Sequence, residues 1–164
     1  MKYLDYSSND SPDIVNSKFE SYRTYLQENR ELFPGGAYEF ASAEWHYNSN
    51  DPKCPHDSWV KCLSIVEEDQ SEKEKGRSID IKVELLGAYH DGTIHLTYER
   101  VISYGLHRGS GSMRGPQTQG HGDWLIDEIR LAPESKGVIH EIKFWLDATW
   151  TIECSDIRYE WIPS

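Results

Sequence analysis

The sequence predicts an α+β protein that consists mainly of antiparallel β-sheet. An apolar stripe with the period of an α-helix occupies the N-terminal part of the chain, and apolar and polar residues alternate through much of the remainder. Turn-forming residues separate the alternating segments, which favours antiparallel neighbours. We therefore expect a single domain over residues 1–164, with one N-terminal amphipathic helix packed on a bent sheet of roughly six to eight strands. The sheet is expected to form a sandwich or an open barrel.

The helix is expected over residues 12–33. Ser11 is a suitable N-cap, and Pro12 suits the first helical position because its missing N–H would have no partner there. The Pro-Gly-Gly sequence at residues 34–36 is expected to end the helix. One side of the helix carries an apolar stripe that comprises Val15, Phe19, Tyr22, Leu26 and Phe33. This stripe needs an apolar surface to cover it, and the sheet provides one.

The β region is expected over residues 37–162. Apart from one hairpin, segments with the pattern of strands fall at residues 37–47, 59–67, 123–132, 138–146 and 150–161. Residues 67–77 carry charges of both signs and no aromatic residue, so they are expected to connect two strands in solvent.

The strongest local signal is a β-hairpin over residues 79–104. Asp91-Gly92 has the composition of a two-residue type I′ turn, in which both positions need a positive φ. This turn sets a register that places Leu85 opposite Tyr98 and aligns apolar residues with apolar residues along one face of the pair.

The same register places Arg100 opposite Val83, on the apolar face of the hairpin. A buried guanidinium group is costly unless it is paired and hydrogen-bonded. One interpretation is that Arg100 anchors an anionic ligand in a cavity within the bent sheet. The others are that Arg100 pairs with a carboxylate such as Glu128, that its charged end reaches solvent at the sheet edge, or that the register differs.

Residues 105–122 form a glycine-rich segment that contains half of the 12 glycines and no acidic residue. Its basic or titratable residues are His107, Arg108, Arg114 and His121. The segment matches neither the P-loop pattern nor the dinucleotide-binding pattern. It is therefore expected to be either a mobile connection between strands or a loop that holds an anionic ligand or a partner.

An enzymatic interpretation would make His121 a general base, oriented by Asp123, with His140 nearby, as in a small hydrolase. No serine lies in the G-x-S-x-G pattern that marks one common nucleophile. The sequence therefore favours a non-enzymatic protein.

The cysteines Cys54, Cys62 and Cys154 show no pair with the spacing typical of a zinc site, so neither a metal nor another cofactor is expected. Their odd number and the absence of an apolar leader favour reduced thiols in the cytoplasm. No apolar run approaches the roughly 18 residues that would span a bilayer.

Trp145 lies on the expected strand 138–146, out of phase with the apolar Phe144 and Leu146. Neighbouring residues of a strand face opposite sides of the sheet. Trp145 is therefore expected either to contact a partner protein, since tryptophan is common at binding hot spots, or to be covered by a second layer of the fold.

The formal net charge of −11 and the pI near 5.0 disfavour nucleic acids and anionic membranes as partners, because both bind through Lys and Arg. A basic protein is the expected partner. The leading hypothesis is a small acidic binding protein of bacterial type that neutralises a basic partner, as immunity proteins do, an analogy that rests on charge and size. The alternative is a pocket for a small anionic ligand inside the bent sheet, with Arg100 as anchor and residues 105–122 as lid.

Overall fold

The computed structural model describes residues 1–5, 9–69, 77–108 and 120–164. Within these residues the protein is α+β, with two α-helices and eight antiparallel strands in two four-stranded sheets, in agreement with the predicted fold class. Sheet A has the strand order β1-β2-β3-β8, with β1 (Trp59–Asp69), β2 (Arg77–Leu86), β3 (Gly92–Glu99) and β8 (Asp156–Pro163). Sheet B has the order β4-β7-β6-β5, with β4 (Ser103–His107), β5 (Trp124–Leu131), β6 (Val138–Phe144) and β7 (Thr149–Cys154).

Two long segments cross from one sheet to the other and bend together. One runs from β3 into β4 and the other from β7 into β8, and they pair on both sides of the bend, at Glu99 with Asp156 and at Ser103 with Glu153. At the bend Arg100 has φ +46°, which re-aims the strand as a bulge residue does. The bend turns the inner faces of the sheets toward each other, which produces the sandwich-like arrangement.

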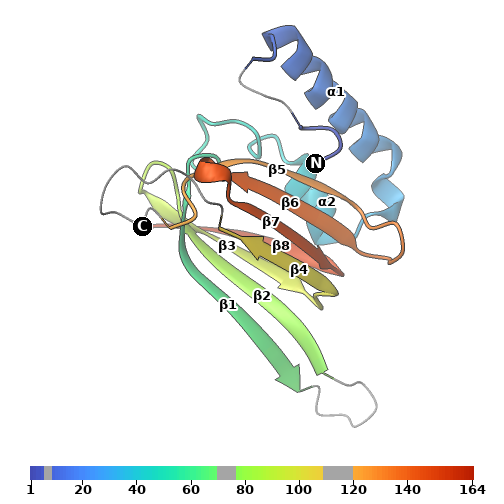
Figure 1. The fold of residues 1–164 in the computed structure, drawn as a ribbon, viewed down its shortest axis with the longest axis vertical. Helices are drawn as coiled ribbons and strands as arrows, with labels where there is room; N and C mark the ends of the chain where they lie inside the picture. The colour runs from blue at the N-terminus through green and yellow to red at the C-terminus, as the bar shows by residue number, and fades with distance from the viewer. Residues whose placement is uncertain (6–8, 70–76, 109–119) are drawn as a thin grey trace.

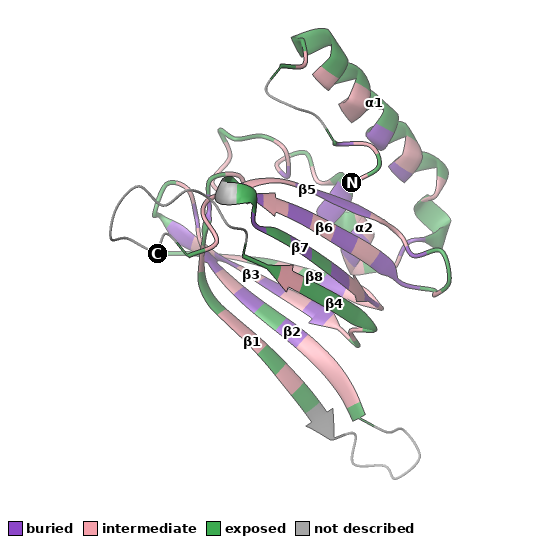
Figure 2. Ribbon diagram, viewed as in Figure 1, coloured by how far each residue is buried: buried purple, intermediate pink, exposed green. Residues whose placement is uncertain are grey.

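The core lies between the two sheets, where alternating residues are buried. These residues include Ile81, Val83, Leu85, Ile94, Leu96, Tyr98, Ile142, Phe144, Trp150 and Ile152. Figure 2 shows the buried residues along the overlap of the sheets, whereas the far end of the β1–β2 hairpin is intermediate or exposed. The alternation predicted from the sequence therefore assigns the inner faces of β2 and β3 correctly.

The predicted hairpin register is wrong, although the predicted face is right. Leu85 pairs with Ile94 rather than with Tyr98, a displacement of four residues. Gly92 is a strand residue rather than part of the turn, because the ring of Trp161 packs against it, and a Cβ there would lie 2.4 Å from that ring. An even displacement leaves every side chain on the same face, so the apolar face stays buried.

Helix α1 (Pro12–Glu28) begins as predicted, since the Ser11 Oγ accepts a hydrogen bond from the Ile14 N–H. It ends earlier than residue 33, and a short 3₁₀ turn (Arg30–Leu32) follows it. The helix lies beside β5, on the side of the molecule away from the β1–β2 hairpin (Figure 1).

Tyrosine hydroxyls bind the helix to the outer edge of β5. The Tyr22 hydroxyl donates to the Ile129 carbonyl at 2.7 Å and accepts from the Ile129 N–H at 2.9 Å. The Tyr25 hydroxyl accepts from the Leu131 N–H at 2.9 Å. These bonds satisfy backbone groups that an edge strand would otherwise expose.

The strand predicted over residues 37–47 is wrong, because residues Gly35–Ser42 form helix α2. The carboxylate of Asp156, on β8, accepts hydrogen bonds from the N–H groups of Gly36 and Ala37 at the start of this helix. Asp156 is 120 residues from Gly36 and 119 residues from Ala37 in the sequence. No local sequence pattern therefore predicts the start of this helix. Gly36 is also needed for the close packing, since a Cβ there would lie 2.3 Å from the Ile157 carbonyl oxygen.

Candidate functional site

A buried polar network joins sheet B to the segment that follows α2. The carboxylate of Asp127, on β5, accepts hydrogen bonds from His46 Nε2 at 2.9 Å, His140 Nε2 at 2.9 Å and Trp124 Nε1 at 3.0 Å. A register irregularity in β5 lies between Trp124 and Ile126 and places Trp124 and Asp127 on the same inner side. All four polar side chains are buried.

The hydrogen-bond partners assign the protons in this network. His46 Nδ1 faces the Phe40 carbonyl at 2.7 Å, and both this carbonyl and the Asp127 carboxylate accept only, so His46 carries a proton on each ring nitrogen. His140 Nε2 donates to Asp127, and His140 Nδ1 lies 3.0 Å from the Tyr98 hydroxyl. The network thus places the imidazolium of His46 in direct contact with the Asp127 carboxylate.

Burial and the two imidazoles act in opposite directions on the pKa of Asp127. Burial raises the pKa of Asp127, but the imidazoles of His46 and His140 outweigh burial and hold this pKa well below its ordinary value. Burial raises the pKa of Tyr98 well above its ordinary value, so its hydroxyl stays protonated. Every polar group of the network has a partner and is screened from solvent, so the arrangement stabilises the fold and offers no free group to a substrate.

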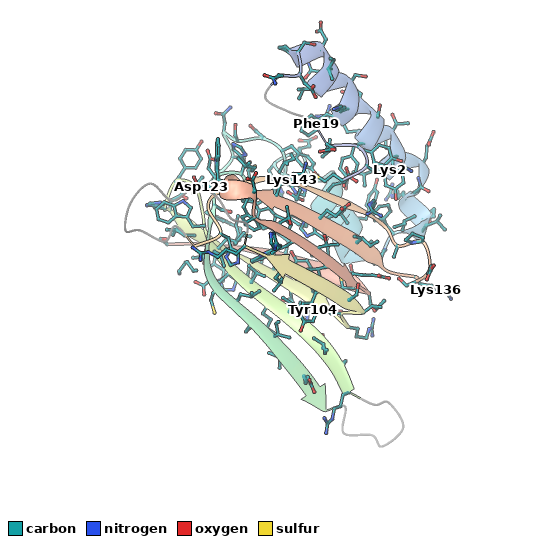
Figure 3. The ribbon with its side chains drawn as sticks, in the orientation of Figure 1. Lys2, Phe19, Tyr104, Asp123, Lys136 and Lys143 are labelled. Carbon is teal, nitrogen blue, oxygen red and sulfur yellow. The ribbon has the colours of Figure 1, made fainter. Side chains whose placement is uncertain are left out.

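Among the described residues, no hydrogen bond joins any two of His121, Asp123 and His140, so the contacts expected of the suggested hydrolase site are not formed. His140 is buried and bonds Asp127 rather than Asp123. Asp123 lies near the turn after β6, where its carbonyl accepts from the Trp145 N–H (Figure 3). His121 packs edge-on against Trp150, with ring centroids 4.9 Å apart, and burial together with the Arg108 charge lowers its pKa.

Arg100 does not lie on the apolar face, because the register differs from the predicted one, which was one of the alternatives left open by the sequence. Leu96, not Arg100, pairs with Val83, and the Arg100 side chain is exposed at the bend, where its N–H donates to the Asp80 carboxylate at 2.9 Å. It lines an open groove of about 800 Å³ rather than a cavity inside the sheet.

Glu128, the partner suggested for Arg100, has other contacts. Its buried carboxylate accepts hydrogen bonds from the N–H groups of Lys2, Tyr3 and Leu4 at 2.7–2.8 Å. Arg130 Nε lies 3.8 Å from the same carboxylate.

Only the two ends of the glycine-rich segment, residues 105–108 and 120–122, belong to the described residues. His107 and Arg108 are exposed there, and Arg108 Nε donates to the Gly120 carbonyl at 3.0 Å. Arg114 and the remainder of residues 109–119 lie outside the described residues, so the interpretation of this segment stays a prediction.

Trp145 lies in a 3₁₀ turn (Trp145–Asp147) rather than in the predicted strand, which ends at Phe144. Its side chain is 54% exposed, so no second layer covers it among the described residues. Gly122, with φ +84°, packs against its backbone, where a Cβ would lie 2.8 Å from the Trp145 carbonyl oxygen. The role of Trp145 as a contact for a partner stays a prediction.

The cysteines are free thiols with different exposure. Burial raises the pKa of Cys54 to about 11 and that of Cys154 to about 12, so both stay protonated, whereas Cys62 is exposed. In residues 1–5, 9–69, 77–108 and 120–164, no group of three or more His, Cys, Asp and Glu residues is arranged to hold a metal ion. In the same part of the chain, no helix has the length and apolar character needed to cross a membrane.

The most prominent surface feature that sequence analysis missed is an open groove of about 930 Å³ between α2 and β8, which we name the α2–β8 groove. Its aromatic floor is formed by Phe40, Trp45 and Tyr159, with ring centroids 4.3 Å apart for Trp45 and Tyr159 and 5.1 Å apart for Phe40 and Tyr159. Because α2 was predicted as a strand, nothing in the sequence pattern placed these rings together.

The rim of the α2–β8 groove is unevenly charged. Its two arginines are engaged: Arg30 lies over the ring of Tyr38 and Arg158 pairs with Glu99. Its acidic residues Glu39, Glu44 and Glu160 form no ion pair with any described residue. The three carboxylates outnumber the two arginines, so the groove presents an excess of negative charge next to aromatic surface.

Comparisons of this chain with protein families, with curated proteins and with solved structures found no match.

Proposed function

We propose that this chain is a non-enzymatic binding protein for a basic protein partner, and that the α2–β8 groove is its contact surface. The observation that carries the proposal is the combination of an aromatic floor with three rim carboxylates that lack a cationic partner. Neutralising a basic effector protein, as immunity proteins do, is the role that this combination and the net charge of −11 favour.

The aromatic and acidic parts of the groove are expected to contribute differently to binding. Each exposed ion pair with the partner stabilises the complex by only about 0.2–1 kcal/mol. The carboxylates therefore act mainly on association rate and selectivity, through steering that weakens as salt rises. The affinity is expected to come chiefly from burial of Trp45 and Tyr159, since large aromatic side chains dominate binding hot spots.

The interior supports a binding role rather than catalysis. The only extended His–Asp network among the described residues is closed around Asp127, where His46 and His140 already have both ring nitrogens engaged. A catalytic base must reach the proton that it removes, and these groups are buried.

The proposed compartment is the reducing cytoplasm, in which free thiols persist. The support is that Cys54, Cys62 and Cys154 are all unpaired.

The test is a selection from a display library of random peptides. We expect the selected peptides to be rich in lysine and arginine and to bind more weakly as salt rises. Replacing Glu39, Glu44 and Glu160 together with Gln should weaken binding about tenfold, the sum of three modest ion pairs.

The matched control replaces the exposed Glu28, Glu31 and Glu134 with Gln, which changes the net charge equally away from the α2–β8 groove. The control should weaken binding less than twofold. Equal losses in both variants, or selected peptides without excess positive charge, would refute the proposal.

A further inference from the structure

The α2–β8 groove also contains an open strand edge. β8 is the last strand of sheet A and pairs only with β3 among the described strands. The Ser164 N–H donates to the Asp91 carbonyl. In an antiparallel pair, every second residue of a strand is hydrogen-bonded to the neighbouring strand. Counting back from Ser164, the residues of β8 that are hydrogen-bonded to β3 are Ile162, Glu160 and Arg158. The backbone N–H and C=O groups of Tyr159 and Trp161 therefore point away from β3, toward the open edge.

The beginning of this edge is closed, and the open part starts in the groove. At Ile157 the start of α2 lies so close that a Cβ on Gly36 would be 2.3 Å from the Ile157 carbonyl oxygen. No described residue outside sheet A hydrogen-bonds to the backbone of Tyr159 or Trp161. The edge of β5, by contrast, is covered by the hydroxyls of Tyr22 and Tyr25.

We propose that the partner binds as an extended basic segment that adds a strand to β8. This inference rests on the proposed function and specifies its binding mode, in which main-chain hydrogen bonds supply affinity and alternate side chains supply specificity. One set of side chains lies over Trp45 and Tyr159, near Glu39 and Glu44, and the other set lies beside Glu160. The excess of carboxylates on the rim favours lysine or arginine over acidic segments.

The experiment uses an acetylated and amidated heptapeptide of alternating lysine and valine. Two N-methylated versions are compared with it, one methylated on the lysines and one on the valines, so that charge is unchanged. Because alternate N–H groups of an added strand point to the same side, one version loses its bonds to β8 and the other does not. We expect one version to bind at least about tenfold more weakly and the other within about threefold of the parent.

The second readout is amide hydrogen exchange. The unmodified heptapeptide should slow exchange at the N–H groups of Tyr159 and Trp161, whereas Glu39, which is on α2, should show no comparable change at its own N–H. Equal binding of all three peptides without protection of Tyr159 overturns strand addition and leaves the proposed function standing. Absence of binding by the unmodified peptide also overturns it. The proposed function itself is tested separately, by the selection from the peptide library and by the variants in which Glu residues are replaced with Gln.

Discussion

Asp127 shows how a single residue can join distant parts of the chain. Its carboxylate receives an N–H from β6 through His140, from the segment after α2 through His46, and from its own strand through Trp124. Because the site is buried, the negative charge is tolerated only with the imidazolium of His46 beside it. The sequence drew attention to His140 but grouped it with His121 and Asp123, because the sequence alone does not show which side chains meet in the folded chain.

Replacing Asp127 with Asn should destabilise the protein by about 3–5 kcal/mol, because His46 is left as a buried charge without its counter-ion. Urea unfolding at pH 7, with Asp147→Asn on the surface as control, measures this loss. A loss below about 1 kcal/mol would contradict the assignment of charges in the network.

The same carboxylate makes stability depend on pH in a defined direction. The folded-state pKa of Asp127 lies below its unfolded value of about 3.9, so its contribution is fully present above that value and is lost as the pH falls through the folded pKa. The difference in unfolding free energy between the wild type and Asp127→Asn should therefore shrink below about pH 4. A constant difference down to pH 2 would show that Asp127 does not titrate differently in the two states.

Gly92 is a second residue whose role depends on a residue far away in the sequence, Trp161. Gly92→Ala should cost about 1–3 kcal/mol, because the added methyl group meets the rigid ring of Trp161 and the Ile162 carbonyl oxygen. Gly105→Ala is the matched control, since a Cβ at Gly105 meets nothing within 4 Å, and it should change stability by less than about 0.5 kcal/mol. Thermal unfolding of both variants checks the pair, and equal effects would contradict the packing argument.

At the scale of secondary structure, helix α1 protects a strand edge. Tyr22 appeared in the predicted apolar stripe and Tyr25 did not. The hydroxyl groups of both matter as much as their rings, because they bond the backbone of β5. The apolar stripe could be predicted because helical periodicity is a local feature of the sequence. That the helix packs against the edge of β5 rather than against a face of the sheet could not be predicted.

Tyr22→Phe tests this role, because the substitution keeps the ring and removes only the hydroxyl. Both backbone groups of Ile129 lose a partner in a buried position, so we expect a loss of about 1–3 kcal/mol in urea unfolding. Tyr104→Phe, on the exposed face of β4 (Figure 3), should have almost no effect. Comparable losses in the two variants would refute the edge-capping role.

Helix α2 is the element whose absence from the prediction matters most for function. The spacing of its buried residues Ala37, Phe40 and Ala41 is helical, but the segment is too short and too close to Gly35 and Gly36 for this spacing to outweigh strand-like alternation. Its start is stabilised by Asp156, and that contact exists only in the folded chain. Because the sequence pattern did not predict α2, it could not predict the α2–β8 groove either.

At the scale of the whole molecule, the bend at Arg100 decides the architecture. It divides two long paired segments between the sheets, so that β8 becomes the edge of one sheet and β4 the edge of the other. The arginine itself is exposed, and its positive φ rather than its charge is what the fold uses. The groove at β8 is thus a consequence of how the sheets meet.

The residue pattern was enough to predict the fold class, the start of α1 and the inner faces of β2 and β3, because helical and strand periodicities depend on neighbouring residues. The register of Gly92 against Trp161, the helical state of α2 and the contact of His140 with Asp127 became visible only in the folded molecule. Each of these depends on atoms contributed by residues far apart in the chain. Such contacts contribute free energy only once the folded backbone has brought the partners together. The local sequence pattern therefore cannot predict them.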